Sequence, residues 1–319
     1  MGHDHSHAGH SHGAHLHHSH AAGFDDRRAY LIGIVLNLGF VVVEVAFGLF
    51  AHSMALLADA GHNLGDVLGL LIAGGASLLA RRKPSQRRTY GFRRATILAA
   101  LANGLLLVVA TGAIVWESIG RLRNPGPVEG GLVAIVAAAG VLVNGASALF
   151  LMKGKKHDVN VHAAFIHLAA DAAVSAGVVV TGILLSLTGY NLLDPVVSLV
   201  LSFIILASTW SLLRRSLDLA LDAVPEQIDP GQVRGYLGGL PGVREVHDLH
   251  IWAMSSTETA LTAHLVTADG SPSSPGFLRD VCHELHQRFH IEHATLQVEP
   301  HETGAPCPLP CRLASDEAV

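Results

Sequence analysis

The fold of this chain is decided by an apolar stretch, residues 54–80, which reads MALLADAGHNLGDVLGLLIAGGASLLA. A helix of roughly 20 apolar residues crosses a bilayer core, and this stretch exceeds that length. It nevertheless carries His62 and Asp66, and their spacing of four residues places both on one face of a helix, one turn apart. Ionisable side chains inside a membrane helix are costly, so we expect these two to face a cavity or a partner group.

A second apolar stretch carries the same pattern, His167-Leu-Ala-Ala-Asp171. Two such helices offer two imidazoles and two carboxylates, a set that Zn2+ accepts in tetrahedral geometry. The carboxylates neutralise the divalent ion, and in its absence the same groups take protons, so metal and protons compete for one site. The sequence therefore predicts a transport site formed by His62, Asp66, His167 and Asp171. Asp59, one turn before His62, is either a partner of this site or a structural residue.

Six stretches are long and apolar enough to span a membrane, in a chain that is 50% hydrophobic and only 15% charged. Basic residues concentrate on one side of these spans, above all in residues 81–94. The positive-inside rule then places both termini in the cytoplasm and the chain in the inner (cytoplasmic) membrane. We expect the basic segment to bind anionic lipid or acidic residues of a partner subunit. The predicted spans are Ala29–Phe50, Met54–Ala80, Ala95–Ile119, Gly131–Met152, His162–Leu187 and Pro195–Leu213.

From Ser216 onward the pattern is that of a soluble domain, with 15 Asp/Glu against 5 Lys/Arg. This negative charge argues against nucleic acid as a partner and for cations. Strand patterns and helix signals alternate in the order α-β-β-α-β, which predicts a small ferredoxin-like sandwich. The predicted strands are Val243–Trp252, Thr259–Thr267 and Ala294–Val298.

The expected fold class is thus an α-helical membrane protein with six transmembrane helices and a C-terminal cytoplasmic α+β ferredoxin-like domain. Nine histidines between His3 and His20 predict a disordered, metal-gathering cytoplasmic tail that is accessory to transport. The proline-rich C-terminal tail is expected to be flexible. The predicted domains are residues 1–24 (histidine-rich tail), 25–215 (membrane domain), 216–300 (cytoplasmic metal-binding domain) and 301–319 (C-terminal tail).

Four motifs together resemble the cation diffusion facilitator family, specifically its zinc-transporting branch. The resemblance covers nearly the whole chain, and it implies a homodimer that exports cytosolic Zn2+ in exchange for protons. It also implies that His62, Asp66, His167 and Asp171 are the transport ligands. The motifs are Leu57-Ala-Asp-Ala-Gly-His-Asn-Leu-Gly-Asp66, Arg88-Thr-Tyr-Gly-Phe92, Asn160-Val-His-Ala-Ala-Phe-Ile-His-Leu-Ala-Ala-Asp171 and Val246-His-Asp-Leu-His-Ile-Trp252.

The same resemblance implies a regulatory zinc site in the cytoplasmic domain, formed by His247, His264 and Glu299. These histidines could instead form a solvated face of the domain. The remaining ligand of the regulatory zinc site stays open. A zinc knuckle formed by Cys307 and Cys311 is a weaker hypothesis, because one residue too many separates the two cysteines. The residues that compete for the open position are His283, His286, Glu292 and His293.

Other functions fit the sequence less well. An intramembrane metalloprotease would show His-Glu-x-x-His and a primary pump would show a phosphate-binding loop, and neither motif occurs in the sequence. A channel needs weak sites, whereas four strong ligands would trap the ion. A membrane metal sensor or receptor that does not transport stays open as the alternative. Two imidazoles favour Zn2+ over Mn2+ or Mg2+, while Cd2+ and Co2+ stay open as further substrates.

Overall fold

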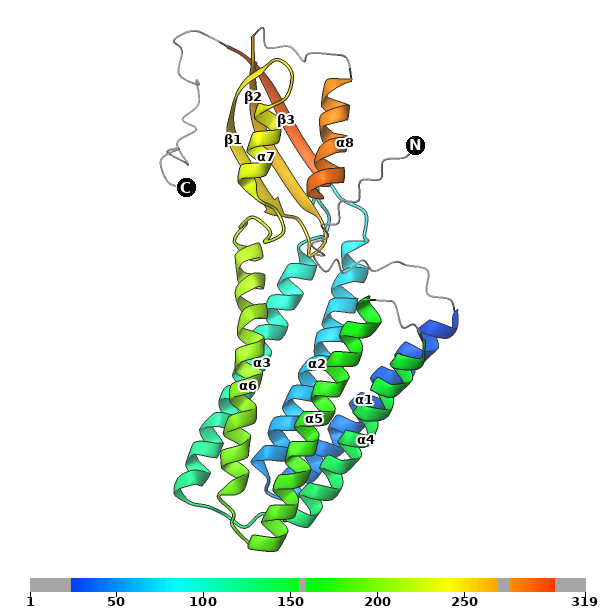
Figure 1. Ribbon diagram of the computed structural model, residues 1–319, viewed down its shortest axis with the longest axis vertical. Coiled ribbons are helices and arrows are strands. Elements are labelled where there is room, and N and C mark those ends of the chain that lie inside the picture. Colours follow the sequence, from blue (N-terminus) through cyan, green and yellow to red (C-terminus); the bar gives the residue numbers. More distant parts are fainter. Residues whose placement is uncertain (1–23, 155–158, 269–275, 302–319) are drawn as a thin grey trace, which may run out of the picture. The chain divides into compact units, whose positions relative to one another are not determined.

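The computed structural model describes residues 24–154, 159–268 and 276–301 (Figure 1). The chain forms two compact units, one of Met1–Ile72 and Ala102–Ser211 and the other of Ala73–Leu101 and Leu212–Val319. The histidine-rich tail and the pair Cys307 and Cys311 lie outside the described residues.

Six long helices coincide with the six predicted spans. Five of them contain a segment long and apolar enough to cross a membrane, and α1 contains a shorter apolar segment, Asn37–Phe50. The helices run past several predicted ends, because loss of hydropathy marks where a chain leaves the bilayer rather than where its helix ends. The helices are α1 (Phe24–Phe50), α2 (Met54–Ala80), α3 (Ala95–Arg123), α4 (Gly130–Gly154), α5 (Val159–Thr188) and α6 (Leu193–Ala220).

Small residues bring α4 and α5 into backbone contact. A Cβ atom added at Gly182 would lie 2.6 Å from the backbone nitrogen of Ala134, and one at Gly130 would lie 2.6 Å from the carbonyl oxygen of Gly182. Only glycine fits at such a crossing, and close approach of this kind stabilises helix pairs where lipid removes the hydrophobic driving force. The abundance of glycine in the spans therefore serves packing here, and the pairing positions the helix that carries His167 and Asp171.

The start of α2 is fixed by a side chain of α6. The carboxylate of Asp194 accepts hydrogen bonds from the Ser53 hydroxyl at 2.5 Å and from the Met54 backbone nitrogen at 2.6 Å. The Ser53 hydroxyl in turn accepts one from the Leu56 backbone nitrogen at 3.1 Å. Asp194 and Ser53 are fully buried. These bonds satisfy donors that a helix N-terminus otherwise leaves unpaired, so they hold in place the helix that carries His62 and Asp66.

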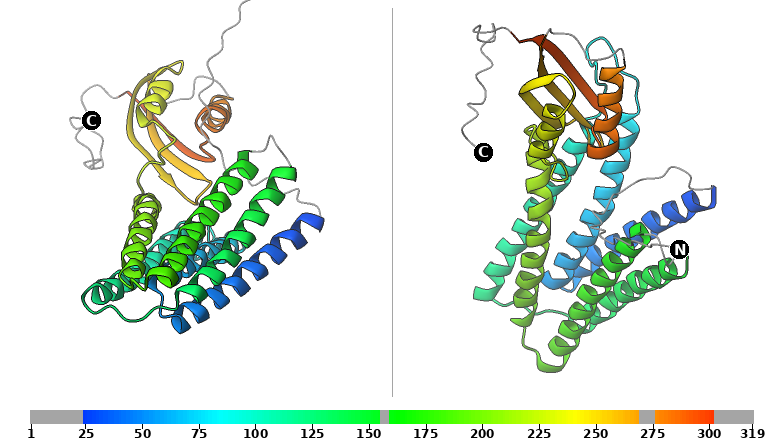
Figure 2. Two further views of the ribbon diagram at one scale, coloured as in Figure 1. Left: turned by 60° about the horizontal axis from the view of Figure 1, so that its bottom comes forward. Right: turned by 45° about the horizontal axis from the view of Figure 1, so that its top comes forward.

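The cytoplasmic domain has the predicted α-β-β-α-β order (Figure 2). The sheet order is β1-β2-β3, with β2 antiparallel to β1 and parallel to β3. The parallel pairing follows from the helix α8 between β2 and β3, because parallel neighbours need such a crossover. Side chains of α7, α8 and the sheet form one buried core, which includes Leu237, Leu261 and Leu285. The elements are α7 (Pro230–Gly238), β1 (Val243–Ala253), β2 (Thr259–Thr267), α8 (Phe277–Phe289) and β3 (His293–Pro300).

Candidate metal sites

The four residues of the predicted transport site lie together in the helical unit. His62 and Asp66 are one turn apart on α2, and His167 and Asp171 are one turn apart on α5. The Nε2 atom of His62 lies 3.2 Å from Asp171 Oδ1 and 3.8 Å from Asp66 Oδ2. The Nε2 atom of His167 lies 3.4 Å from Asp66 Oδ2 and 3.6 Å from Asp171 Oδ2. Each imidazole therefore faces both carboxylates, including the one on the other helix.

These distances match the size of a tetrahedral site. Two ligand atoms that are each about 2.0 Å from a tetrahedral zinc ion lie about 3.3 Å apart. The ligand atoms of His62, Asp66 and Asp171 all lie within 4.8 Å of one another. The rings of His62 and His167 meet edge to face, with centroids 6.4 Å apart. His62, Asp66 and Asp171 are thus close enough to hold one cation, while His167 lies outside this group of three.

The four side chains differ in exposure. Asp171 is buried, with 7% of its side chain exposed, whereas His167 is 52% exposed. His62 and Asp66 are intermediate. The site is thus more enclosed at Asp171 than at His167.

Asp59 belongs to a separate group of polar side chains. Its carboxylate accepts a hydrogen bond from the Ser175 hydroxyl at 2.8 Å. Glu44 of α1, which was not among the predicted site residues, belongs to the same group through a hydrogen bond from Asn63 of α2 at 3.0 Å. The signal for Glu44 was nevertheless present, since an ionisable residue within a predicted span is a functional candidate by itself.

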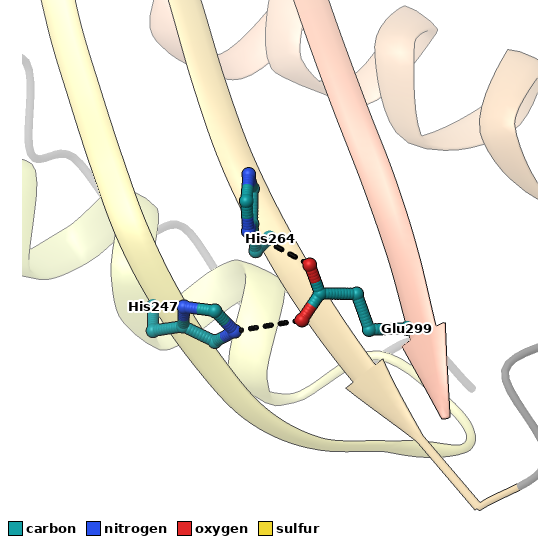
Figure 3. A group of neighbouring side chains, drawn as sticks. All are labelled: His247, His264 and Glu299. Atoms are coloured by element: carbon teal, nitrogen blue, oxygen red, sulfur yellow. Dashed lines mark hydrogen bonds and ion pairs between the residues drawn. The ribbon is translucent and has the colours of Figure 1, made fainter. Parts of the chain in front are cut away.

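A second group of candidate ligands lies on the sheet of the cytoplasmic domain (Figure 3). His247 of β1 and His264 of β2 are directly opposite each other in the antiparallel register. The Nε2 atom of His247 lies 3.1 Å from Glu299 Oε2, and the Nδ1 atom of His264 lies 2.9 Å from Glu299 Oε1. About a fifth of each side chain is exposed: 20% for His247, 19% for His264 and 23% for Glu299. The cluster can bind a cation from solution.

The alternation of side chains places this cluster on the sheet face away from α7 and α8. Leu261, Ala263 and Leu265 of β2 belong to the core under the helices. His264 lies between two of them in sequence, so it points to the opposite face. A bulge in β1 between His247 and His250 puts Asp248 at φ 52°, in the left-handed region.

This bulge adds a carboxylate to the cluster. Asp248 Oδ2 lies 3.6 Å from His264 Nε2, and Asp248 Oδ1 lies 3.0 Å from His250 Nε2. Both ring nitrogens of His264 therefore face a carboxylate, that of Glu299 and that of Asp248. This role of Asp248 was not predictable from the sequence, because the bulge depends on tertiary structure rather than on a local pattern.

The four residues proposed for the open ligand position of the cytoplasmic site do not join this cluster in the described part of the chain. His283 and His286 of α8 belong to neither group of three neighbouring ligand residues found there. The ring of His293 packs edge-on against Tyr90, with centroids 5.6 Å apart. Glu292 accepts a hydrogen bond from the Thr259 backbone nitrogen at 2.7 Å.

The basic segment 81–94 contacts acidic residues of its own chain. Arg93 donates to Glu258 at 2.7 Å, and Arg94 forms an ion pair with Asp222. The Thr96 hydroxyl accepts a hydrogen bond from the Ser256 backbone nitrogen at 3.0 Å. Carboxylates of the same chain, Glu258 and Asp222, are therefore partners of the basic segment. Binding of this segment to lipid or to a partner subunit stays a prediction.

Comparison with known proteins assigns both parts of the chain. The cation efflux transmembrane domain matches residues 30–219, and the cytoplasmic domain of cation efflux proteins matches residues 225–301. The zinc transporter ZitB of Escherichia coli (strain K12) is 37% identical over 301 residues, which cover 94% of this chain and 93% of that protein.

Two further relatives carry broader names. The metal cation efflux system protein CzcD of Cupriavidus metallidurans is 34% identical, over 96% of this chain and 91% of its own. The "cadmium, cobalt and zinc/H(+)-K(+) antiporter" of Bacillus subtilis is 32% identical, over 86% of this chain and 89% of its own. The chain therefore belongs to the cation diffusion facilitator family, in its zinc-transporting branch, whose members are membrane-embedded cation efflux transporters and not enzymes.

Proposed function

We propose that this protein exports Zn2+ from the cytoplasm in exchange for protons, and that the ion binds between His62, Asp66, His167 and Asp171. The observation that carries this proposal is the meeting of two His-x-x-x-Asp pairs from α2 and α5, with each imidazole nitrogen 3.2–3.8 Å from a carboxylate oxygen of both helices. The names of ZitB and CzcD, which concern zinc transport and metal cation efflux, support the same function.

The ligand types define the substrate class. Imidazole nitrogen and carboxylate oxygen together suit Zn2+, whereas Mg2+ and Mn2+ prefer sites made of oxygen. Two carboxylates balance the charge of one divalent ion, which lowers the cost of holding it in a medium of low dielectric constant. Cd2+ and Co2+ fit the same donors, and both ions appear in the name of the Bacillus subtilis relative.

Proton exchange follows from the same four side chains. When the ion leaves, two carboxylates remain close together, and their mutual repulsion favours uptake of protons by the cluster. Metal binding requires deprotonated ligands, so each arriving ion displaces protons. The two cargoes exclude each other at one site, which is the minimum requirement for antiport.

The direction of transport and the assembly are part of the proposal. Basic residues in the segment 81–94 and beyond α4 support an orientation with both termini in the cytoplasm of the cell and the protein in its inner membrane. We expect a homodimer in the lipid bilayer, with the cytoplasmic domain binding regulatory Zn2+ at His247, His264 and Glu299. Because that part of the chain carries 15 Asp/Glu against 5 Lys/Arg, bound zinc would reduce the repulsion between two such domains.

Zinc flux into proteoliposomes tests the proposal against its alternative, a metal receptor that does not transport. The unchanged chain should accumulate zinc when a pH gradient is imposed, and Asp171→Ala should abolish accumulation because it removes a ligand and a charge. Asp218→Ala is the matched control, since Asp218 is an exposed carboxylate whose neighbour is Arg214. Normal flux in Asp171→Ala would refute the site, and zinc binding without flux in the unchanged chain would favour the receptor.

A further inference from the structure

A second buried group of polar side chains lies one helical turn from the proposed transport site. Asp59 is three residues before His62 on α2, and Ser175 is four residues after Asp171 on α5. Glu44 of α1 completes the group. Side chains of three helices thus meet at this level.

Each of the two carboxyl groups uses one oxygen in a hydrogen bond to a neighbouring helix. Glu44 Oε2 accepts from Asn63 Nδ2 at 3.0 Å, and Asp59 Oδ2 accepts from the Ser175 hydroxyl at 2.8 Å. Glu44 is 0% exposed and Asp59 is 1% exposed. The two bonds join α1 to α2 and α2 to α5.

The two remaining oxygens have no hydrogen-bond donor. Glu44 Oε1 and Asp59 Oδ1 are buried and unpartnered. The two residues are neighbours, because Asn63, which donates to Glu44, is one helical turn after Asp59 on α2. Two buried acceptors without donors carry a large desolvation cost, and two neighbouring ionised carboxylates repel each other strongly. One proton placed between them would turn two unpartnered oxygens into a donor and an acceptor.

In the described part of the chain, the one basic side chain that acts on the pair is His62, which belongs to the proposed metal site and acts on Asp59 alone. Among the described residues, the other titratable groups that act on Asp59 are His62 of α2 and Asp171 of α5, and Glu44 interacts in this way with Asp59 alone. Helix α4, which packs against α1 and α5, has no titratable residue between Gly130 and Met152. The packing there is tight, because a Cβ atom at Gly140 would lie 3.1 Å from the Ser175 hydroxyl.

We propose that Glu44 and Asp59 share one proton and form a proton-binding site distinct from the four metal-binding residues. A metal cation is a poorer occupant than a proton, because only two oxygens are free and hard cations take about six or more oxygen ligands. A pair that carries one negative charge instead of two also lowers the cost of burying two acidic side chains with at most 1% exposure.

The placement of this site connects it to transport, and this part of the inference rests on the proposed function. The Asp59–Ser175 bond and the His62–Asp171 contact are two successive links between α2 and α5. Loss of the shared proton leaves two like charges between α1 and α2, which favours their separation. Any helix movement that accompanies zinc binding then changes the proton affinity of the pair, and by linkage the proton changes the zinc affinity equally.

Infrared spectroscopy of the purified, zinc-free protein in lipid tests for the proton directly. A protonated carboxylic acid shows a C=O stretching band that is separate from carboxylate bands and shifts in D2O. We expect the unchanged protein to show this band at neutral pH, and we expect both Glu44→Gln and Asp59→Asn to lose the same band. Glu117→Gln, which changes an exposed glutamate on α3 that pairs with Arg121, should keep it.

Three outcomes would overturn the shared-proton site. These are absence of the band in the unchanged protein, persistence of the band in either Glu44→Gln or Asp59→Asn, and its disappearance on adding K+ or Na+ at constant pH, which would identify a metal cation as the occupant. Because zinc is absent throughout, failure of the proposed transport function leaves this result unaffected. The link to transport is tested separately. Glu44→Gln should keep zinc binding but weaken the dependence of zinc flux on the imposed pH gradient, and an unchanged dependence would refute the link.

Discussion

The membrane site and the cytoplasmic cluster use the same side chains on different scaffolds. Both combine two imidazoles with carboxylates, and in both a histidine nitrogen lies about 3 Å from a carboxylate oxygen: 3.2 Å between His62 and Asp171, and 3.1 Å between His247 and Glu299. The first is built from residues one turn apart on two helices. The second is built across three strands, from residues 17 and 35 positions apart in sequence.

This difference separates what each site can do. The helix site encloses Asp171 and offers two carboxylates, so it can neutralise a divalent ion within a membrane. The sheet cluster lies in the cytoplasmic domain, with about a fifth of each side chain exposed: 20% for His247, 19% for His264 and 23% for Glu299. We expect transport to depend on the first site and the response to cytosolic zinc to depend on the second.

Removing one imidazole from each site in turn should give the largest difference in zinc flux between variants of the two sites. His167→Ala deletes a ligand, and we expect zinc flux to fall by at least about 100-fold, since even partners of a ligand contribute up to that factor. His264→Ala should leave the flux at saturating zinc close to that of the unchanged chain. Flux into proteoliposomes measures both, and equal losses in the two variants would show that the sites do not have separate roles.

Exchanging one ligand type at the membrane site should sharpen the comparison. His62→Asp replaces nitrogen by oxygen, which should shift preference from Zn2+ toward Cd2+ or Mn2+ by at least about 10-fold. Competition between metals in the flux assay measures this, with His247→Asp as the control in the other site. An unchanged order of preference would mean that ligand identity does not select the ion.

Asp248 offers a smaller test, confined to the cytoplasmic cluster. Asp248→Asn keeps a residue that tolerates the left-handed backbone at φ 52° and removes the charge beside His264. Zinc affinity of the cluster should fall about 10-fold, as expected for a group that orients a ligand. Calorimetric titration of the cluster in a chain carrying His167→Ala isolates this effect, and unchanged affinity would show that Asp248 only shapes the bulge.

The histidine-rich tail should have the smallest effect. Deleting residues 1–23 is expected to raise the zinc concentration needed for half-maximal flux while leaving the maximal rate unchanged, because the tail gathers metal without forming the site. A concentration series with the shortened chain measures both quantities. Complete loss of flux would make the tail part of the transport pathway.

The sequence predicted those features that local patterns encode. The spans follow from hydropathy, and the grouping of His62 with Asp66, and of His167 with Asp171, follows from helical periodicity. The order of elements in the cytoplasmic domain follows from strand alternation and helix signals.

Features that depend on tertiary contacts were not predictable in this way. The bulge that brings Asp248 to His264 changes the strand register, and no local sequence pattern predicts this change. Contacts of Arg93 with Glu258, and of Glu44 with Asn63, join residues of different elements. Resemblance to a family supplied His264 and Glu299 as partners of His247, because spacing alone did not connect them.

X-ray absorption at the zinc edge tests the central claim most directly. The protein would lack residues 1–23 and carry His247→Ala and His264→Ala, so that competing ligands are removed. We predict a shell of two imidazole nitrogens and two carboxylate oxygens at about 2.0–2.2 Å, and loss of the bound zinc in the further variant Asp171→Ala. A shell containing sulfur, a shell with no imidazole, or zinc retained in Asp171→Ala would contradict a transport site made of His62, Asp66, His167 and Asp171.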